Sequence, residues 1–91
     1  MEEMLLELGL DKYASVEGRN NSYVIDLGSD SDFGRIYTAL DNSEYVVQEE
    51  ESVLLTVHNA SIIYEYKDEY QLVLKADFDN ELYSVIITEM K

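Results

Sequence analysis

Residues 53–88, VLLTVHNASIIYEYKDEYQLVLKADFDNELYSVIIT, alternate apolar and polar side chains between short groups of turn-forming residues. A period of two is typical of β-strands, because successive side chains of a strand point to opposite faces of the sheet. The Asp79-Asn80 pair suits a two-residue hairpin turn. This turn predicts cross-strand pairs that all lie on one apolar face: Ala76–Tyr83, Leu74–Val85 and Leu72–Ile87.

Three further turns extend this face toward the N-terminus. A three-residue loop at 67–69 predicts the pairs Tyr64–Leu72 and Ile62–Leu74. A two-residue turn at Asn59-Ala60 predicts the pairs Val57–Ile62, Leu55–Tyr64 and Val53–Tyr66. A three-residue loop at 49–51 places Val47 beside Val53 and Tyr45 beside Leu55, so that Tyr45 belongs to the core. Because a slip of one residue moves a whole strand's apolar side chains to the other face, this agreement predicts the register.

The upstream part of the chain predicts a short helix and further strands. Residues 2–14 are read as a helix that ends near Leu8, because Gly9 follows its apolar stripe. Residues 22–27 alternate as a strand. Residues 34–40 fit a strand or a short helix capped by Ser31, and the strand is preferred because Asp41-Asn42-Ser43 then turns directly into 44–48.

The predicted fold is therefore a single α+β domain over residues 1–91 that is mostly β. A short N-terminal helix is followed by an antiparallel meander of six or seven strands. The second face of this sheet also carries an apolar stripe, formed by Val46, Leu54, Ile63, Val73 and Ile86. Such a stripe is unusual when exposed on a monomer. The N-terminal helix is expected to cover it; curling of the sheet and packing of a second copy are the alternatives.

The composition excludes several classes of function. The chain has 20 Asp and Glu against 6 Lys and Arg, a net charge of −14, one His and no Cys. Direct nucleic-acid binding is electrostatically disfavoured. His58 is expected on the surface, and the segment Asp30–Gly34 starts like a calcium loop without supplying the later ligands. We expect no cofactor, no metal and no enzymatic activity. The N-terminus lacks the basic residues of a signal peptide, so a cytoplasmic protein without membrane contact is expected.

The acidic residues gather at the predicted turns. In a meander alternate turns share an end, which places loops 41–43, 59–60 and 78–80 together and loops 49–51 and 67–69 at the opposite end. The denser group holds Glu49, Glu50, Glu51, Asp68 and Glu69. Carboxylates two residues apart on a strand are roughly 6.6 Å apart, comparable to successive phosphates, and can occupy arginines that hold phosphate. Acidic turns also protect strand edges from aggregation, and this alternative stays open.

One stretch resembles a known group of proteins. Residues 23–52, YVIDLGSDSDFGRIYTALDNSEYVVQEEES, follow a short acidic helix and resemble small phage-encoded anti-CRISPR proteins that inhibit Cas9. Within it, Asp41-Asn42-Ser43-Glu44-Tyr45-Val46 is similar to a D-x-x-E-Y-V hairpin turn whose carboxylates face the arginines that read the PAM. The resemblance implies that Asp41, Ser43 and Glu44 bind a partner, and Glu49–Glu51 resemble the acidic segment of that inhibitor. It covers about a third of the chain, and residues 52–90 depart from it because they read as strands.

These observations lead to three hypotheses. The first is a stoichiometric inhibitor that mimics nucleic acid and blocks the site of a basic protein, a CRISPR effector nuclease by resemblance, in the host cell cytoplasm if phage-encoded. The second is an immunity protein that neutralises a basic nuclease toxin. The third is a structural protein that self-associates as a homodimer through the second apolar sheet face. Salt should weaken the first two complexes and leave the third unchanged.

Overall fold

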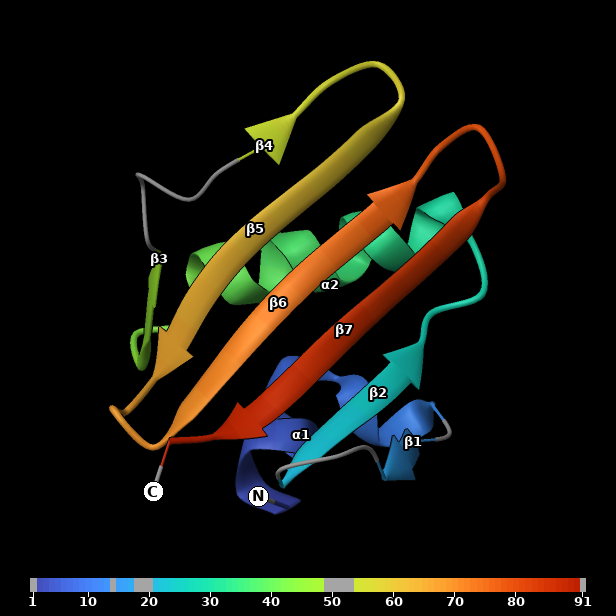
Figure 1. The fold of residues 1–91 in the computed structure, drawn as a ribbon. Helices are drawn as coiled ribbons and strands as arrows, with labels where there is room; N and C mark the ends of the chain where they lie inside the picture. Colours follow the sequence, from blue (N-terminus) through green and yellow to red (C-terminus); the bar gives the residue numbers. More distant parts are fainter. Residues whose placement is uncertain (1, 14, 18–20, 49–53, 91) are drawn as a thin grey trace.

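A computed structural model describes residues 2–13, 15–17, 21–48 and 54–90 (Figure 1). The helical elements are α1 (Glu2–Leu8), the short 3₁₀-helix η1 (Leu10–Lys12) and α2 (Asp30–Asn42). The strands are β1 (Ser15–Glu17), β2 (Ser22–Asp26), β3 (Val46–Gln48), β4 (Leu54–Leu55), β5 (Asn59–Tyr66), β6 (Tyr70–Asp77) and β7 (Leu82–Glu89). The prediction of a mostly β, α+β fold with a short N-terminal helix is confirmed.

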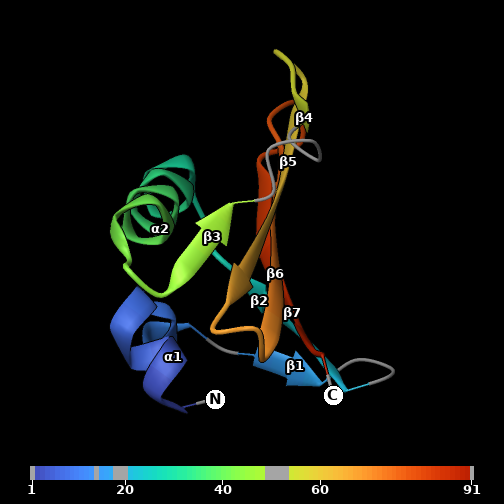
Figure 2. The same ribbon diagram turned by 90° about the vertical axis from the view of Figure 1, so that its left-hand side faces the viewer.

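The strands form one antiparallel sheet in the order β1-β2-β7-β6-β5-β3, and β4 also pairs with β5. Strands β5, β6 and β7 follow one another as a meander. The upstream strands depart from meander order, because β2 pairs with β7 and the chain then crosses to β3 through α2. Figure 2 shows both helices on one face of this sheet.

The two long hairpins have the predicted register. Ala76 lies opposite Tyr83, Leu74 opposite Val85 and Leu72 opposite Ile87. Tyr64 lies opposite Leu72, and Ile62 opposite Leu74. All of these side chains are buried, and they pack with Met4, Leu8, Ile36 and Leu40 of the two helices in one core. The continuous apolar face inferred from the turns is therefore the sheet face that packs against the helices and forms the core.

Residues 34–40 belong to a helix, so the preference for a strand there is wrong. Ser29, not Ser31, is the N-cap, and its Oγ accepts a hydrogen bond of 3.2 Å from the Asp32 amide. Asp30 and Asp32 place negative charge in the first turn, where the helix dipole favours it. Ile36 and Leu40, one helical turn apart, are fully buried against the sheet.

The register predicted for β4 is also wrong. Leu55 pairs with Ala60 and Leu54 with Ser61, so Asn59 opens β5 instead of forming the turn. Thr56 explains the change, because its Oγ1 accepts hydrogen bonds from the His58 and Asn59 backbone amides at 3.1 and 2.9 Å and so closes the turn two residues earlier, at Val57-His58. The side chains of Leu55 and Val57, which were expected in the core, are exposed. Val53 lies outside the described residues.

Strand β3 pairs with β5 and not with the strand that follows it. Val46 lies opposite Tyr66 and packs against the core, whereas Val47 is exposed. This is the reverse of the predicted faces, as expected when a strand is shifted by an odd number of residues. Tyr45, predicted as core, is 44% exposed. The proposed loop at 49–51 lies outside the described residues.

The expectation that the N-terminal helix covers the second sheet face is wrong. Met4 and Leu8 of α1 join the core on the same face as α2 (Figure 2). Ile63, Val73 and Ile86 point to the other face and are half-buried. Along the described part of the chain, no helix lies over them.

Candidate acidic interaction surface

The end of α2 and the β5–β6 turn lie side by side. The Lys67 amide donates a 3.1 Å hydrogen bond to the carbonyl of Tyr45, which directly precedes β3. The ammonium group of Lys67 lies 4.4 Å from the ring centroid of Tyr45 and 5.4 Å from that of Tyr66. The predicted separation of loops 41–43 and 67–69 to opposite ends is therefore wrong, because β3 pairs directly and antiparallel with β5, which places the start of β3 beside the end of β5.

The predicted partner-binding residues that the structure describes are accessible. Asp41 is exposed on the last turn of α2, and Glu44 is exposed just beyond it. Ser43 is the C-cap residue, and its Oγ accepts a 3.3 Å hydrogen bond from the Tyr45 amide. Asp68 and Glu69 are exposed in the β5–β6 turn. The hairpin expected at Asp41–Ser43 is replaced by a helix end, and Glu49, Glu50 and Glu51 lie outside the described residues.

Helix α1 adds carboxylates that the sequence analysis missed. The Tyr66 hydroxyl donates a 2.7 Å hydrogen bond to Glu7 Oε2. Burial, this hydrogen bond and the negative charges of Glu7 and Glu3 raise the pKa of Tyr66 to about 12. Glu7 also lines an open depression of ≈ 360 Å³ with Ala39, Asn42, Ser43 and Glu44. The sequence feature that points to these carboxylates is the spacing of Glu3 and Glu7, which are one helical turn apart and each precede a buried residue, Met4 and Leu8.

We use the name acidic end for the group formed by Glu3, Glu7, Asp41, Glu44, Asp68 and Glu69. All six side chains are exposed, and they come from α1, α2, the α2–β3 connection and the β5–β6 turn. Within the described residues, no Lys or Arg lies within ion-pair distance of them. Lys67, the nearest basic residue along the chain to Asp68 and Glu69, faces two aromatic rings. The six carboxylates are therefore available to an external cation.

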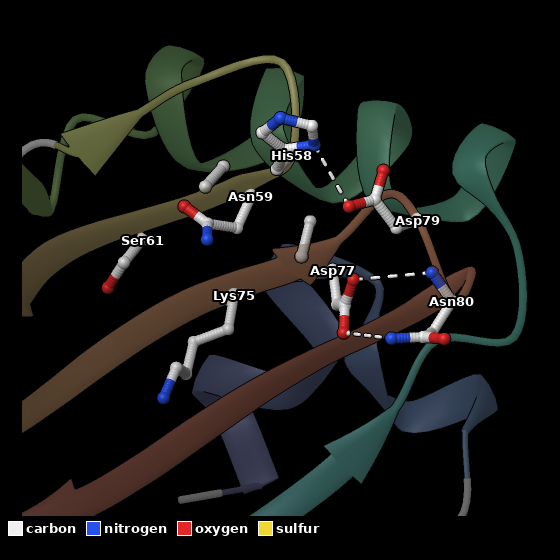
Figure 3. Close-up of a pocket in the computed structure, with 9 residues that line it drawn as sticks. His58, Asn59, Ser61, Lys75, Asp77, Asp79 and Asn80 are labelled. Atoms are coloured by element: carbon white, nitrogen blue, oxygen red, sulfur yellow. Dashed lines mark hydrogen bonds and ion pairs between the residues drawn. The ribbon is translucent and has the colours of Figure 1, made fainter.

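The opposite end of the sheet carries a mixed polar pocket of ≈ 610 Å³ (Figure 3). His58 Nδ1 lies 2.9 Å from Asp79 Oδ2, which links the β4–β5 and β6–β7 turns. Asn80 donates two hydrogen bonds to the Asp77 carboxylate, one from its side-chain Nδ2 at 2.8 Å and one from its backbone amide at 3.2 Å. These hydrogen bonds lower the pKa of Asp77. The expectation of a surface histidine is confirmed, since the His58 side chain is 69% exposed.

The Asp30–Gly34 segment has a structural role. Tyr13 Oη donates to Asp32 Oδ1 at 2.7 Å, and Ser29 Oγ donates to Asp32 Oδ2 at 2.9 Å. These hydrogen bonds, with Arg35 at 3.6 Å, lower the pKa of Asp32. Among the described residues, no group of three or more His, Asp or Glu is placed to hold a metal ion. No described helix has the length and apolar character needed to cross a membrane.

No protein-family model, curated protein or solved structure matches this chain.

Proposed function

We propose that this protein is a stoichiometric inhibitor that mimics nucleic acid and blocks the basic nucleic-acid site of another protein. The observation that carries the proposal is the acidic end, where six exposed carboxylates from separate elements have no Lys or Arg within ion-pair distance among the described residues. Arginine binds carboxylates and phosphates with the same forked geometry, so such a group competes directly for arginines that hold nucleic acid.

The net charge of −14 supports this function kinetically. A strongly charged protein attracts an oppositely charged partner over distances of about a Debye length, roughly 8 Å at physiological salt. Such steering raises the association rate. The proposed complex therefore forms quickly and weakens as salt is added.

Several of these carboxylates are held on ordered elements. Asp41 stands on a helix whose Ile36 and Leu40 are buried, and Glu7 is fixed by Tyr66 at 2.7 Å. The β5–β6 turn is tight, because the Glu69 amide donates to the Tyr66 carbonyl at 3.0 Å. Groups already held in place lose less conformational entropy on binding, which favours affinity.

A CRISPR effector nuclease is the target that we propose, on the resemblance of Asp41–Val46 to the PAM-site-binding segment of an anti-CRISPR protein. The segment lies at a helix end and not in a hairpin, but Asp41 and Glu44 are both exposed there. In this proposal they meet the arginines that read guanine, and the remaining members of the acidic end meet neighbouring backbone-binding cations.

The experiment measures binding of a tagged protein to a Cas9-type effector loaded with guide RNA, together with cleavage of a target DNA. The wild-type protein should bind one to one, compete with PAM-containing duplex and lose affinity as salt rises. The double variant Asp41→Asn/Glu44→Gln should lose at least tenfold in affinity, since two charge-assisted contacts at about 1.5–3 kcal/mol each are removed.

A matched control removes the same charge elsewhere. Asp30 and Glu81 are exposed around a small depression beside Tyr83, at the opposite end of α2. Asp30→Asn/Glu81→Gln should change affinity less than threefold. Equal losses in both variants would show that net charge alone drives binding, and would overturn the assignment of the acidic end. Capture of no basic nucleic-acid-binding protein, from this effector or from host lysate at low salt, would overturn the function.

A further inference from the structure

The second face of the sheet carries a straight row of β-branched residues. Val24 lies opposite Ile86, Ile86 opposite Val73, and Val73 opposite Ile63, so the row crosses β2, β7, β6 and β5. Each of these side chains is half-buried, whereas their neighbours Ile25, Ile87, Leu72, Leu74 and Ile62 are buried in the core beneath. The row therefore faces away from the helices (Figure 2).

Polar side chains border this row on both sides. The register places Ser22, Thr88, Gln71 and Glu65 along one side, and Asp26, Ser84, Lys75 and Ser61 along the other. Asp26, Glu65 and Lys75 are the charged members of these two borders. Asp77 lies on the same face at the end of β6, so the four strands present three carboxylates and one lysine there, a small share of the net charge of −14.

We propose that this face is the interface of a homodimer in which two copies pack sheet against sheet. Two copies of a chain with charge −14 repel each other, so they can approach closely only through a surface with few carboxylates. A basic partner would favour the acidic end over this face. An apolar row bordered by Ser, Thr and Gln can instead pack against an identical row, as the inner faces of a β-sandwich do.

The positions of the charged residues are compatible with a two-fold axis along the row. Rotation about that axis places each border over the opposite border of the other copy. Lys75 then lies over Gln71 of the second copy and is offset sideways from its Glu65 by one strand, about 4.8 Å, which these long side chains can span across the interface. Asp26 lies over Ser22 of the second copy. No two like charges of these borders face each other, and one opposite-charge pair forms on each side.

The area of the face is adequate for a weak or moderate dimer. Strands β5, β6 and β7 have eight residues each and β2 has five. At about 4.8 Å between strands and about 3.3 Å per residue, they span a projected area of roughly 500 Å². Protruding side chains raise the accessible area toward the roughly 800 Å² per partner of a standard interface.

The test measures molar mass by sedimentation or light scattering over a concentration series at low and high salt. The dimer fraction should hold or increase with salt, because salt screens repulsion between the copies. Val73→Lys should give a monomer, while Val57→Lys, at a side chain 83% exposed outside the row, should leave the dimer intact. Circular dichroism establishes that both variants fold. A wild-type protein that stays monomeric up to millimolar concentration at both salts would overturn the proposal.

Cross-linking gives a second readout that needs no charge inserted into the face. The chain has no Cys, so one introduced Cys reacts at a single position. With a short bis-maleimide, Val73→Cys should give a covalent dimer, because Val73 meets its own copy at the axis. Thr38→Cys, exposed on α2, should not. Equal cross-linking at both positions would contradict the interface, whereas a monomer that still binds a basic target would leave the proposed inhibitor function standing.

Discussion

The hydroxyl of Tyr66 donates a 2.7 Å hydrogen bond to Glu7, across 59 residues of sequence. It ties the end of β5 to α1 and holds one carboxylate of the acidic end. Tyr64 lies two residues earlier on the same buried face, but its hydroxyl has no hydrogen-bond partner among the described residues. The two tyrosines thus form a natural pair for measuring what a buried hydroxyl contributes.

Replacement of Tyr66 by Phe should lower the free energy of unfolding by about 1–2 kcal/mol, because a hydrogen bond to a charged acceptor is lost. Tyr64→Phe should be neutral or stabilising, since it removes a buried polar atom without a described partner. Urea denaturation of both variants and the wild type checks the pair. A larger loss for Tyr64→Phe than for Tyr66→Phe would contradict this hydrogen-bond assignment.

Alkaline pH should destabilise the fold partly through Tyr66. Its pKa rises from 10.0 to about 12 in the folded protein, so the native state keeps a proton that the unfolded chain releases. This contribution is complete below pH 10 and disappears as the pH rises through 12. Unfolding free energies measured across this range should fall less steeply in Tyr66→Phe than in the wild type. Identical slopes would show that Tyr66 does not take part.

The N-cap of α2 gives a third prediction. Ser29→Ala should cost about 1 kcal/mol of stability, because the Asp32 amide loses its acceptor. Ser31→Ala serves as the control, since Ser31 is exposed within the first turn of the helix. It should change stability by less than about 0.5 kcal/mol. Thermal denaturation compares them, and a greater effect at Ser31 would favour the cap inferred from sequence.

The register of β3 can be tested with two neighbouring valines. Val46 packs against the core opposite Tyr66, whereas Val47 is 67% exposed. Val46→Ser should therefore destabilise the protein by about 1–2 kcal/mol, through lost apolar burial. Val47→Ser should stay within about 0.5 kcal/mol of the wild type. The reverse order in chemical denaturation would restore the register predicted from the 49–51 loop.

The sequence predicts the β5–β6–β7 meander well because its turns are local and both of its faces alternate strictly. Leu72 and Leu74 each pair with an apolar residue on both neighbouring strands, so a wrongly placed turn would pair them with polar residues. The secondary structure of residues 30–42 is harder to predict. Ile36 and Leu40 have the spacing of one helical turn, but the apolar segment that contains them is too short to exclude a strand. The pairing of β3 with β5 depends on tertiary contacts, since several short strands compete for the same edge.

The candidate site also has a part that the sequence predicts and a part that it does not. The exposure of Asp41, Glu44, Asp68 and Glu69 follows from their places at turns and helix ends, which are local features. Their gathering at one end could not be predicted, because it depends on the direct pairing of β3 with β5, which is a tertiary contact. Glu7 was missed for a related reason. Its neighbour Tyr66 is distant in sequence, and only the packing of α1 beneath β5 brings them together.

The place of β7 has a consequence for how the protein is made. This strand follows every other described strand in sequence, yet it lies between β2 and β6 and joins the two parts of the sheet. During synthesis, β2 can pair only with β1 until residues 82–89 have left the ribosome. The sheet can therefore close only late, and a ribosome that stalls before β7 would leave one edge of β2 and one edge of β6 without the strand that pairs with it.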